Sequence, residues 1–262
     1  MDGIITCVCP TFNRPELLGR AIRAFEKQTY ENKFMVIIDD TGQYNNQKGD
    51  CWELISIPRR VLSLGEKRNI GASLAPKDTW AYAVWDDDDL YMPWHLEALA
   101  EALTRGEFVQ PRMVVDFWGG EWVQVQTFGA KNFSRKSTGR PVQQIRPARG
   151  IQTHCYHGCW GYTRKLFEEV GGYPPRYADD DGVFQKKIIK LGKVSVGFDP
   201  AYPPSYFYNR QLENRISEKG KTSAIIYHQN KVDVAFIGEV PKWQDESEWD
   251  QKIPDKIIER PW

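Results

Sequence analysis

Four consecutive aspartates, Asp86 to Asp89, stand between an apolar run and Pro93 in the stretch YAVWDDDDLYMP. Neighbouring carboxylates repel one another, so a folded chain that keeps four of them together needs a compensating charge. Hard divalent cations prefer oxygen ligands, and Mg²⁺ usually takes one or two carboxylates together with substrate phosphates. Asp86 and Asp88 have the spacing that puts two side chains on one side of an extended chain. This pattern favours a cation site over a solvated acidic turn ahead of the next helix.

A second acidic pair ends another apolar run. Asp39 and Asp40 close FMVIIDD, which is typical of a strand buried on both faces. The carboxyl ends of parallel strands meet at one edge of a sheet, where α/β proteins bind their ligands. We therefore expect Asp39 and Asp40 to lie on the same edge as the Asp86–Asp89 run.

The first half of the chain alternates between strand and helix patterns. Short apolar runs predict strands, and apolar residues at helical spacing predict helices. Strands are expected over 4–10, 34–40, 51–58 and 79–87, and helices over 14–28, 65–75 and 93–105. Such alternation indicates a parallel sheet in an α/β domain.

The second half follows a different pattern. A hairpin is expected over 108–129, with Gly119 and Gly120 near its turn. Helices are expected over 163–172 and 181–192, and strands over 193–198 and 205–210. The basic segment from Lys131 to Arg149 is expected to be a long loop that closes over a bound ligand. We divide the chain into residues 1–105, residues 106–215 of the same domain, and a C-terminal extension, 216–262.

Composition narrows the class of protein. Lys plus Arg and Asp plus Glu are both 35, so the formal net charge is zero, which disfavours a general nucleic-acid coat or a membrane-surface protein. No apolar window is long enough to predict a transmembrane segment. The odd count of five cysteines and the lack of a secretion signal indicate a reducing, cytoplasmic location.

A cluster of zinc-type ligands occurs in THCYHGCW. His154, Cys155, His157 and Cys159 fall within six residues. Structural zinc sites usually join two separated ligand pairs, and no second pair is visible. A zinc site is therefore the less favoured interpretation of this block.

Four blocks of the sequence occur in an order that resembles a known family. They are CPTFNRPELLGRAIRAFEKQTYENKFMVIIDDTG, LGEKRNIGASLA, YAVWDDDDLYMPWHLEAL and GCWGYTRKLFEEVGGYPPRYADDDGVFQKKI. Together they resemble the inverting family-2 glycosyltransferases of GT-A fold, over roughly residues 4 to 190. The resemblance implies an α/β fold with a Rossmann-like, mostly parallel central sheet flanked by helices, and a smaller acceptor-side sub-region. It also implies transfer of a sugar, with inversion, from a nucleotide-diphosphate sugar to a hydroxyl acceptor such as a glycan.

The resemblance assigns the donor and metal sites to particular residues. A UDP-sugar is the most expected donor, with Asp39 or Asp40 accepting a hydrogen bond from a uracil-like N–H. Mn²⁺ or Mg²⁺ is the expected cofactor. The metal would be held by Asp88 and Asp86, with His228 as a further candidate, and Arg210 would approach the pyrophosphate. Trp160 would stack on the sugar, with His157 and Gly158 nearby. The remaining residues expected to bind the donor are Thr11, Asn13, Arg14, Asp39, Asp40, Arg68, Asn69, Asp86 and Asp87.

The third acidic run, YADDDGVF, is the expected source of the catalytic base. The family's Glu–Asp pair corresponds here to Asp179–Asp180, so the resemblance implies that Asp180, and next Asp179, removes the proton from the acceptor hydroxyl. The third acid, Asp181, leaves the register open by one residue. The alternative is that these acids simply cap the following helix.

Other functions compete with sugar transfer. A nucleotidyltransferase can use a similar acidic cluster, although no glycine-rich phosphate loop follows the first strand. A non-catalytic binder of nucleotide sugars is the second alternative. Nucleic acid as the acceptor is a minority option that the basic loop would favour and the neutral net charge disfavours.

Overall fold

The protein is described by a computed structural model. The structure describes residues 3–111, 113–118, 121–127, 156–175, 179–199, 202 and 205–209. The basic loop Lys131–Arg149, the extension 216–262, Arg210 and His228 lie outside these residues, and the expectations about them stay predictions.

An eight-stranded sheet forms the centre of the fold, in the order β11-β7-β10-β5-β1-β2-β4-β3. The four strands β5, β1, β2 and β4 are parallel neighbours, whereas β10 runs antiparallel to both β5 and β7. The expected mostly parallel α/β sheet is therefore confirmed. Its strands are β1 (Ile4–Thr11), β2 (Lys33–Asp39), β3 (Gln47–Lys48), β4 (Trp52–Ser56), β5 (Thr79–Val84), β7 (Phe108–Val109), β10 (Gly161–Thr163) and β11 (Ser195–Val196).

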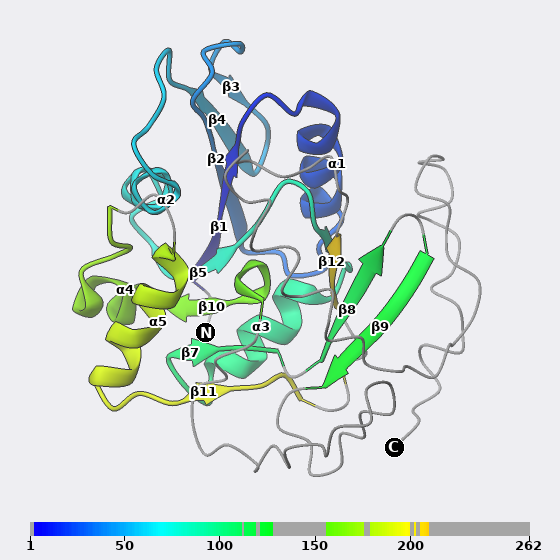
Figure 1. The fold of residues 1–262 in the computed structure, drawn as a ribbon, viewed down its shortest axis with the longest axis vertical. Coiled ribbons are helices and arrows are strands. Elements are labelled where there is room, and N and C mark those ends of the chain that lie inside the picture. Colours follow the sequence, from blue (N-terminus) through cyan, green and yellow to red (C-terminus); the bar gives the residue numbers. More distant parts are fainter. Residues whose placement is uncertain are drawn as a thin grey trace, which may run out of the picture.

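Helices cover both faces of this sheet. They are α1 (Pro15–Glu26), α2 (Leu64–Ser73), α3 (His95–Leu103), α4 (Arg164–Val170) and α5 (Asp180–Lys190), with a short 3₁₀ turn, η1 (His157–Cys159). Figure 1 shows α1 and α2 on opposite sides of β1. The longest described helix, α1, has 12 residues, and none of the described helices is long and apolar enough to span a membrane.

The two helices that flank β1 pack by different means. Helix α1 begins with Pro15 in its first turn and buries Leu18, Ala21 and Phe25 at helical spacing. Helix α2 has no such apolar stripe, and it approaches the sheet through Gly71. A Cβ at Gly71 would lie 2.5 Å from Val8 Cγ1, so this crossing requires glycine. The polar side chains of α2 are thereby brought close to the ends of the strands.

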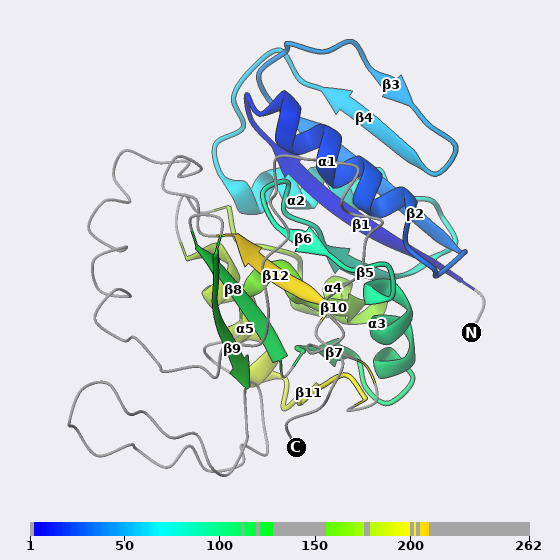
Figure 2. The same cartoon turned by 90° about the vertical axis from the view of Figure 1, so that its right-hand side faces the viewer.

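A second sheet stands beside the first, in the order β6-β12-β8-β9 (Figure 2). It consists of β6 (Leu90–Tyr91), β12 (Tyr206–Asn209), β8 (Met113–Trp118) and β9 (Glu121–Thr127). The antiparallel pair β8–β9 is the hairpin that the sequence predicts. Strand β6 joins the two sheets, because it follows β5 of the main sheet after only a short turn. That turn contains the four consecutive aspartates.

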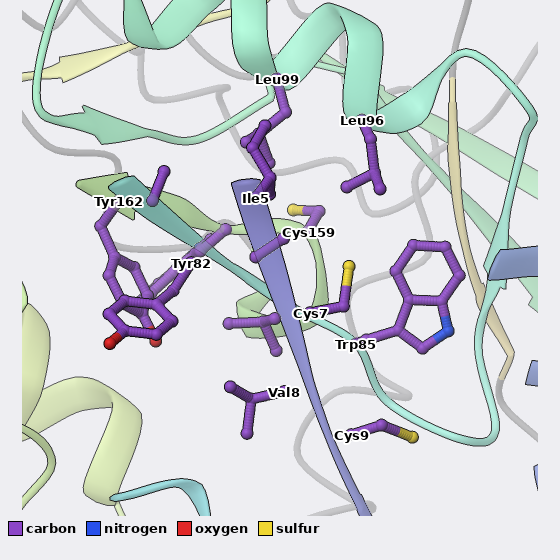
Figure 3. Close-up of a cluster of buried hydrophobic side chains, with 14 of the residues drawn as sticks. Ile5, Cys7, Val8, Cys9, Tyr82, Trp85, Leu96, Leu99, Cys159 and Tyr162 are labelled. Carbon is purple, nitrogen blue, oxygen red and sulfur yellow. The ribbon is translucent and has the colours of Figure 1, made fainter. Parts of the chain in front are cut away.

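The core is built on both sides of β1. In Figure 3, Cys7, Cys9 and Trp85 lie on one side of this strand, and Val8, Tyr82 and Tyr162 lie on the other. Trp85 is fully buried, and its ring stacks on Tyr91 with centroids 3.8 Å apart and an interplanar angle of 17°. Since Trp85 immediately precedes Asp86, this large buried ring anchors the start of the acidic turn.

A buried histidine on α3 makes the stability of the fold depend on pH. His95 is fully buried, its Nδ1 lies 2.9 Å from the Ser205 hydroxyl, and burial lowers its pKa to about 3. Histidine in an unfolded chain has a pKa of about 6.5, so below that pH the unfolded state binds a proton that the native state does not. We expect this residue to reduce the free energy of unfolding by about 2 kcal/mol between pH 7 and pH 5.

Urea titrations of the wild type and of His95→Gln at the two pH values measure this effect. All other titrating groups are shared, so they cancel in the difference between the two proteins. The wild type is expected to lose about 2 kcal/mol more than the variant on acidification. Equal losses would show that His95 does not contribute to the pH dependence.

Candidate active site

The acidic turn Asp86–Asp89 connects β5 to β6 and divides its four acids into two kinds. The side chains of Asp86 and Asp88 are 25% and 24% exposed, whereas Asp87 and Asp89 are buried. This partly exposed pair has the Asp-x-Asp spacing that the sequence suggested for a cation. Asp86 and Asp88 are therefore the two carboxylates of the turn that a ligand can reach.

Tyrosines from two strands hold the backbone and one acid of this turn. The backbone N–H of Asp86 donates to the Tyr91 hydroxyl at 2.8 Å, and that hydroxyl donates to the carbonyl of Gly158 at 3.0 Å. The Tyr206 hydroxyl donates to Asp89. Asp89 thus anchors the turn to β12, and its role is structural.

The segment after β1 binds the other acids of the turn. The Thr11 hydroxyl donates to Asp87 at 2.6 Å, and one Arg14 nitrogen, Nη1, contacts Asp87 at 3.0 Å and Asp88 at 2.8 Å. Asn13 is exposed between them with a φ of 52°, a left-handed conformation that asparagine tolerates. The structure therefore brings Thr11 and Arg14 to the acidic turn and leaves Asn13 at the surface beside it.

The acidic turn carries negative charge that the protein only partly compensates. Burial raises the pKa of Asp88 to about 6, with the neighbouring charge of Asp87 adding to the effect and Arg14 opposing it. The pKa values of Asp86 and Asp87 are also raised, first by burial. A bound cation would relieve this unfavourable charge.

Asp39, at the end of β2, forms hydrogen bonds with neighbouring protein groups. It is fully buried, and its carboxylate accepts hydrogen bonds from the Thr41 hydroxyl at 2.8 Å, the Ser56 hydroxyl at 2.7 Å and the Gly42 amide at 3.2 Å. These bonds hold the turn that follows β2. The structure therefore does not support the expected contact between Asp39 and a nucleobase.

Asp40 is the centre of a second buried ion pair. Its carboxylate lies 2.5 Å from Lys67 Nζ and 2.8 Å from Arg60 Nη1. Lys67 also donates to the backbone carbonyl of Thr11, and the Arg60 guanidinium stacks 3.6 Å above the Phe12 ring. Asp40 thus fixes two cations at the carboxyl ends of β1, β2 and β4, rather than pointing freely to a ligand.

The two α2 residues expected to bind the donor make protein contacts instead. Arg68 is 5% exposed and bridges two carboxylates, Asp180 Oδ2 at 2.7 Å and Asp86 Oδ1 at 3.3 Å. The Asn69 amide pairs with both backbone groups of Tyr173, at 2.9 Å each. These contacts join the acidic turn to the segment that leads into α5.

The downstream acids occupy three different environments. Asp179 has an exposed side chain, a left-handed φ of 59° and a weak ion pair with Lys186 at 3.8 Å. Asp180, the first residue of α5, is buried against Arg68. Asp181 accepts the Gly182 amide at 2.8 Å, and burial raises its pKa. Asp179 makes no side-chain capping bond, whereas Asp181 satisfies an amide of the first turn of α5. Asp180 is the acid of the run that is brought toward Asp86, through Arg68.

The block around η1 is packed into the core. Trp160 is 3% exposed and packs edge-on against Phe108, with centroids 5.3 Å apart. Its ring faces are therefore covered, and the structure does not support the expected stacking on a sugar. His157 Nε2 lies 2.8 Å from the Tyr173 hydroxyl, and burial lowers the pKa of His157 well below its ordinary value. His154 and Cys155 lie outside the described residues.

A divalent metal fits the acidic turn when its other ligands come from a substrate. Within the described part of the chain, no group of three or more His, Cys, Asp and Glu side chains converges on one point. The protein side of the site is thus the exposed pair Asp86 and Asp88. Mg²⁺ and similar ions commonly bind to one or two carboxylates and complete their coordination with phosphate oxygens and water.

A side chain at Gly158 would collide with the acidic turn. A Cβ there would lie 2.5 Å from the Tyr206 hydroxyl, 2.7 Å from Asp89 Oδ2 and 3.0 Å from Asp86 Oδ2. Tyr206 and Asp89 are buried and cannot move aside freely. We expect Gly158→Ala to lower the free energy of unfolding by about 1–3 kcal/mol, measured by urea titration.

The same substitution in α1 is the matched control for Gly158→Ala. The nearest described atom to a Cβ at Gly19 is Arg23 Nη1, at 3.5 Å. Alanine favours a helix interior over glycine, so Gly19→Ala should raise the free energy of unfolding by roughly 0.5–1 kcal/mol. A Gly158→Ala variant that is as stable as the wild type would contradict the tight packing at this position.

The family model for glycosyl transferase family 2 matches residues 6–171, which is more than half of the chain. The family match and the α/β fold thus define the class as that of the glycosyltransferase families with a GT-A fold, as the sequence suggested. The protein belongs to glycosyl transferase family 2. No curated protein matches the sequence.

Solved glycosyltransferase structures share the fold at low sequence identity. Residues 1–349 of Staphylococcus aureus TarS are 13% identical, with a TM-score of 0.54 over 78% of this chain and 60% of that one. The mannosyltransferase PcManGT from Pyrobaculum calidifontis, in complex with GDP-Man and Mn²⁺, is 15% identical, with a TM-score of 0.54 over 82% and 59%. TarS 1–349 in complex with UDP-GlcNAc is 12% identical, with a TM-score of 0.53 over 88% and 68%. The chain spans about 60% of the length of the first of these relatives.

Several residues of the site have no signal in the sequence pattern. Lys67 stands within GEKRN, yet nothing local indicates that it pairs with Asp40. Tyr206 supports the acidic turn from a distant part of the chain, and Gly158, which was expected near the sugar, accepts a bond from Tyr91 instead. Tyr91, two residues after Asp89, is close enough in sequence to the aspartates to have been suspected.

Proposed function

We propose that the protein transfers a sugar from a nucleotide-diphosphate sugar to a hydroxyl acceptor, with inversion at the anomeric carbon and with Mn²⁺ or Mg²⁺ as cofactor. Membership of glycosyl transferase family 2 supports the class of reaction. The single observation that carries the finer proposal is the chain of contacts Asp86–Arg68–Asp180. It joins an exposed carboxylate of the acidic turn to a candidate base from another part of the chain.

The donor side of the site is the acidic turn and the segment after β1. Asp88 and Asp86 would hold the metal against the donor's diphosphate, and Arg14 would keep Asp88 in place through its contact at 2.8 Å. When bound, the metal supplies Lewis-acid stabilisation of the diphosphate leaving group. PcManGT was solved with GDP-Man and Mn²⁺, and TarS with UDP-GlcNAc, which supports a nucleotide-sugar donor of either base.

The structure supports no preference for uracil as the base of the donor, although the sequence suggested one. A preference for UDP rested on a carboxylate at the end of β2 that accepts a hydrogen bond from uracil. Asp39 and Asp40 both have protein partners in that position. We therefore propose a nucleotide-sugar donor without assigning its base.

Asp180 would act as the general base. In the transfer, the acceptor oxygen forms a bond to the anomeric carbon, and the bond from that carbon to the donor phosphate oxygen breaks. The acceptor proton passes to Asp180, and the electron pair of the broken bond leaves with the nucleoside diphosphate. Asp180 Oδ2 accepts from Arg68, and no bond to Oδ1 is found among the described residues, which leaves that oxygen for the proton.

The proposal divides the chain into the same three segments that the sequence indicated. Residues 1–105 would bind the donor, residues 106–215 would hold the acceptor and the base, and 216–262 would form an extension. The main sheet contains strands from both of the first two segments, which supports a single domain. The acceptor is proposed as a hydroxyl compound such as a glycan.

A thermal-shift screen tests the proposed function most directly. The protein is heated with UDP, GDP, UDP-GlcNAc and GDP-mannose, each with Mn²⁺, with Mg²⁺ and with EDTA. We expect a metal-dependent rise in melting temperature with at least one nucleotide, followed by slow release of its sugar to water. No response to any of them would refute the proposal. Stabilisation without sugar release would favour a non-catalytic binder, and a response to nucleoside triphosphates alone would favour a nucleotidyltransferase.

A further inference from the structure

Arg68 connects the two parts of the proposed site more directly than any other described residue. Its Nη1 donates to Asp180 Oδ2 at 2.7 Å, and its Nη2 donates to Asp86 Oδ1 at 3.3 Å. Asp86 and Asp180 come from separate segments of the chain, the turn between β5 and β6 and the start of α5. One guanidinium group on α2 therefore spans from the donor-side carboxylate to the candidate base.

The packing of α2 makes this span rigid. A Cβ at Gly65 would lie 2.5 Å from the Pro174 carbonyl and 3.2 Å from the Asp180 Cβ, so α2 touches the segment that leads into α5. One residue after Arg68, the Asn69 amide is bonded to both backbone groups of Tyr173. The position of Asp180 is thus tied to α2 at several points.

Little of the Arg68 side chain is free to meet a ligand. It is 5% exposed, each terminal nitrogen already donates to a carboxylate, and Nε is buried without a hydrogen-bond partner. The charges of Asp86 and Asp180 raise the pKa of Arg68 above its ordinary value, although burial alone would lower it. Arg68 is therefore a permanent cation enclosed between two acids, which differs from the exposed arginines that usually bind phosphate.

We propose that Arg68 is a positioning residue for the transfer step, which holds the Asp180 carboxylate at a fixed place relative to Asp86 and does not bind the donor phosphates. The proposal rests on the proposed function, because it assigns Asp86 to the donor side and Asp180 to the base. A planar guanidinium with two engaged nitrogens sets both direction and distance, which a flexible ammonium does not. An inverting displacement needs this precision, since the base and the leaving group stand on opposite sides of the sugar.

Substitution of Arg68 separates positioning from phosphate binding. The affinity for UDP and GDP with Mn²⁺ is measured by calorimetry, and the turnover of UDP-GlcNAc and GDP-mannose to free sugar is measured without an acceptor. For Arg68→Gln we expect turnover of the active donor to fall about 100-fold, while the Kd of its nucleotide stays within about twofold. Arg68→Lys keeps the charge but not the planar fork, so it should recover only part of the turnover.

A double substitution tests whether Arg68 acts through Asp180. In an Asp180→Asn background, Arg68→Gln should lower turnover by no more than about twofold further, because the base is already lost. If the losses of turnover from Arg68→Gln and Asp180→Asn instead multiply in the double variant, Arg68 has a general structural role and the proposal is overturned. Should Arg68→Gln fail to fold, Arg68→Lys in the same two backgrounds gives the same comparison.

Arg164→Gln is the matched control. Arg164 is a partly exposed arginine of α4 whose Nε lies 2.8 Å from Glu168, and exposed pairs of this kind contribute little. It should change neither affinity nor turnover. A tenfold or larger rise in the nucleotide Kd with Arg68→Gln, at unchanged turnover, would make Arg68 a phosphate ligand and refute positioning. A wild-type protein that neither binds nor turns over any donor would instead refute the proposed function itself.

Discussion

Replacing Asp88 by asparagine is expected to abolish Mn²⁺-dependent binding of a nucleoside diphosphate. Asp88 is one of two partly exposed carboxylates in the acidic turn, and the amide of asparagine is a far weaker ligand for a hard cation. We expect the Kd for the nucleotide with Mn²⁺ to rise by about 100-fold or more, as measured by calorimetry. The affinity measured in EDTA should be the same in the variant and the wild type.

The other end of β5 offers a matched control for this substitution. Asp78 is exposed and directly precedes β5, whereas Asp88 lies beyond the strand's carboxyl end. Asp78→Asn removes the same charge at the opposite end of β5 and should leave the metal-dependent affinity unchanged. Asp88→Asn with wild-type affinity in Mn²⁺ would move the metal away from this turn and would remove the main support for the donor site.

Replacing Asp180 by asparagine is expected to preserve nucleotide binding and to remove catalysis. The variant has almost the same shape and can still contact Arg68, but it cannot take a proton from the acceptor. Loss of a general base typically lowers the rate by about 10²–10⁴-fold. Turnover of the active nucleotide sugar should therefore fall by about that factor, while the Kd measured by calorimetry with Mn²⁺ changes little.

The neighbouring acids provide the comparison that assigns the base. Asp179 is exposed with its weak pair to Lys186, and Asp181 bonds the Gly182 amide. If Asp180 is the base, Asp179→Asn and Asp181→Asn should each retain most of the turnover. A loss of turnover confined to Asp179→Asn or Asp181→Asn would shift the base to that residue. Both variants also show whether the negative charge of the run matters as a whole.

Much of the fold follows from local patterns in the sequence. Apolar runs and helical spacing predicted β1, α1, β2, β4, β5 and α3 in their correct order, and Gly119–Gly120 marked the β8–β9 hairpin. Helix α2 was also expected, although it has no apolar stripe. These patterns work because burial repeats with the period of each element. The strand order of the main sheet, with β10 inserted antiparallel between β5 and β7, depends on pairings between distant segments and had no local signal.

The acidic runs also show where local patterns end. Asp39 and Asp40 were expected to bind a ligand because they end a buried strand. The structure does place them at the carboxyl end of β2. Their use depends on Thr41, Ser56 and Lys67, which the fold brings to them. Trp160 was expected at a sugar for its chemical type, but the fold buries it, with only 3% of the residue exposed.

The sequence by itself indicated an α/β fold with acids at the carboxyl ends of its strands, and a resemblance to family-2 glycosyltransferases that the family match confirms. Composition, period and the order of four blocks are sufficient for that, because they reflect local burial and chain order. Only the tertiary structure decided which acids stay partly exposed and which are buried in contacts with other protein groups. Asp86 and Asp88 differ from Asp87 and Asp89 through contacts with Thr11, Tyr206 and other distant residues. The link from Arg68 to Asp180 spans 112 residues, and it exists because α2 packs against the start of α5.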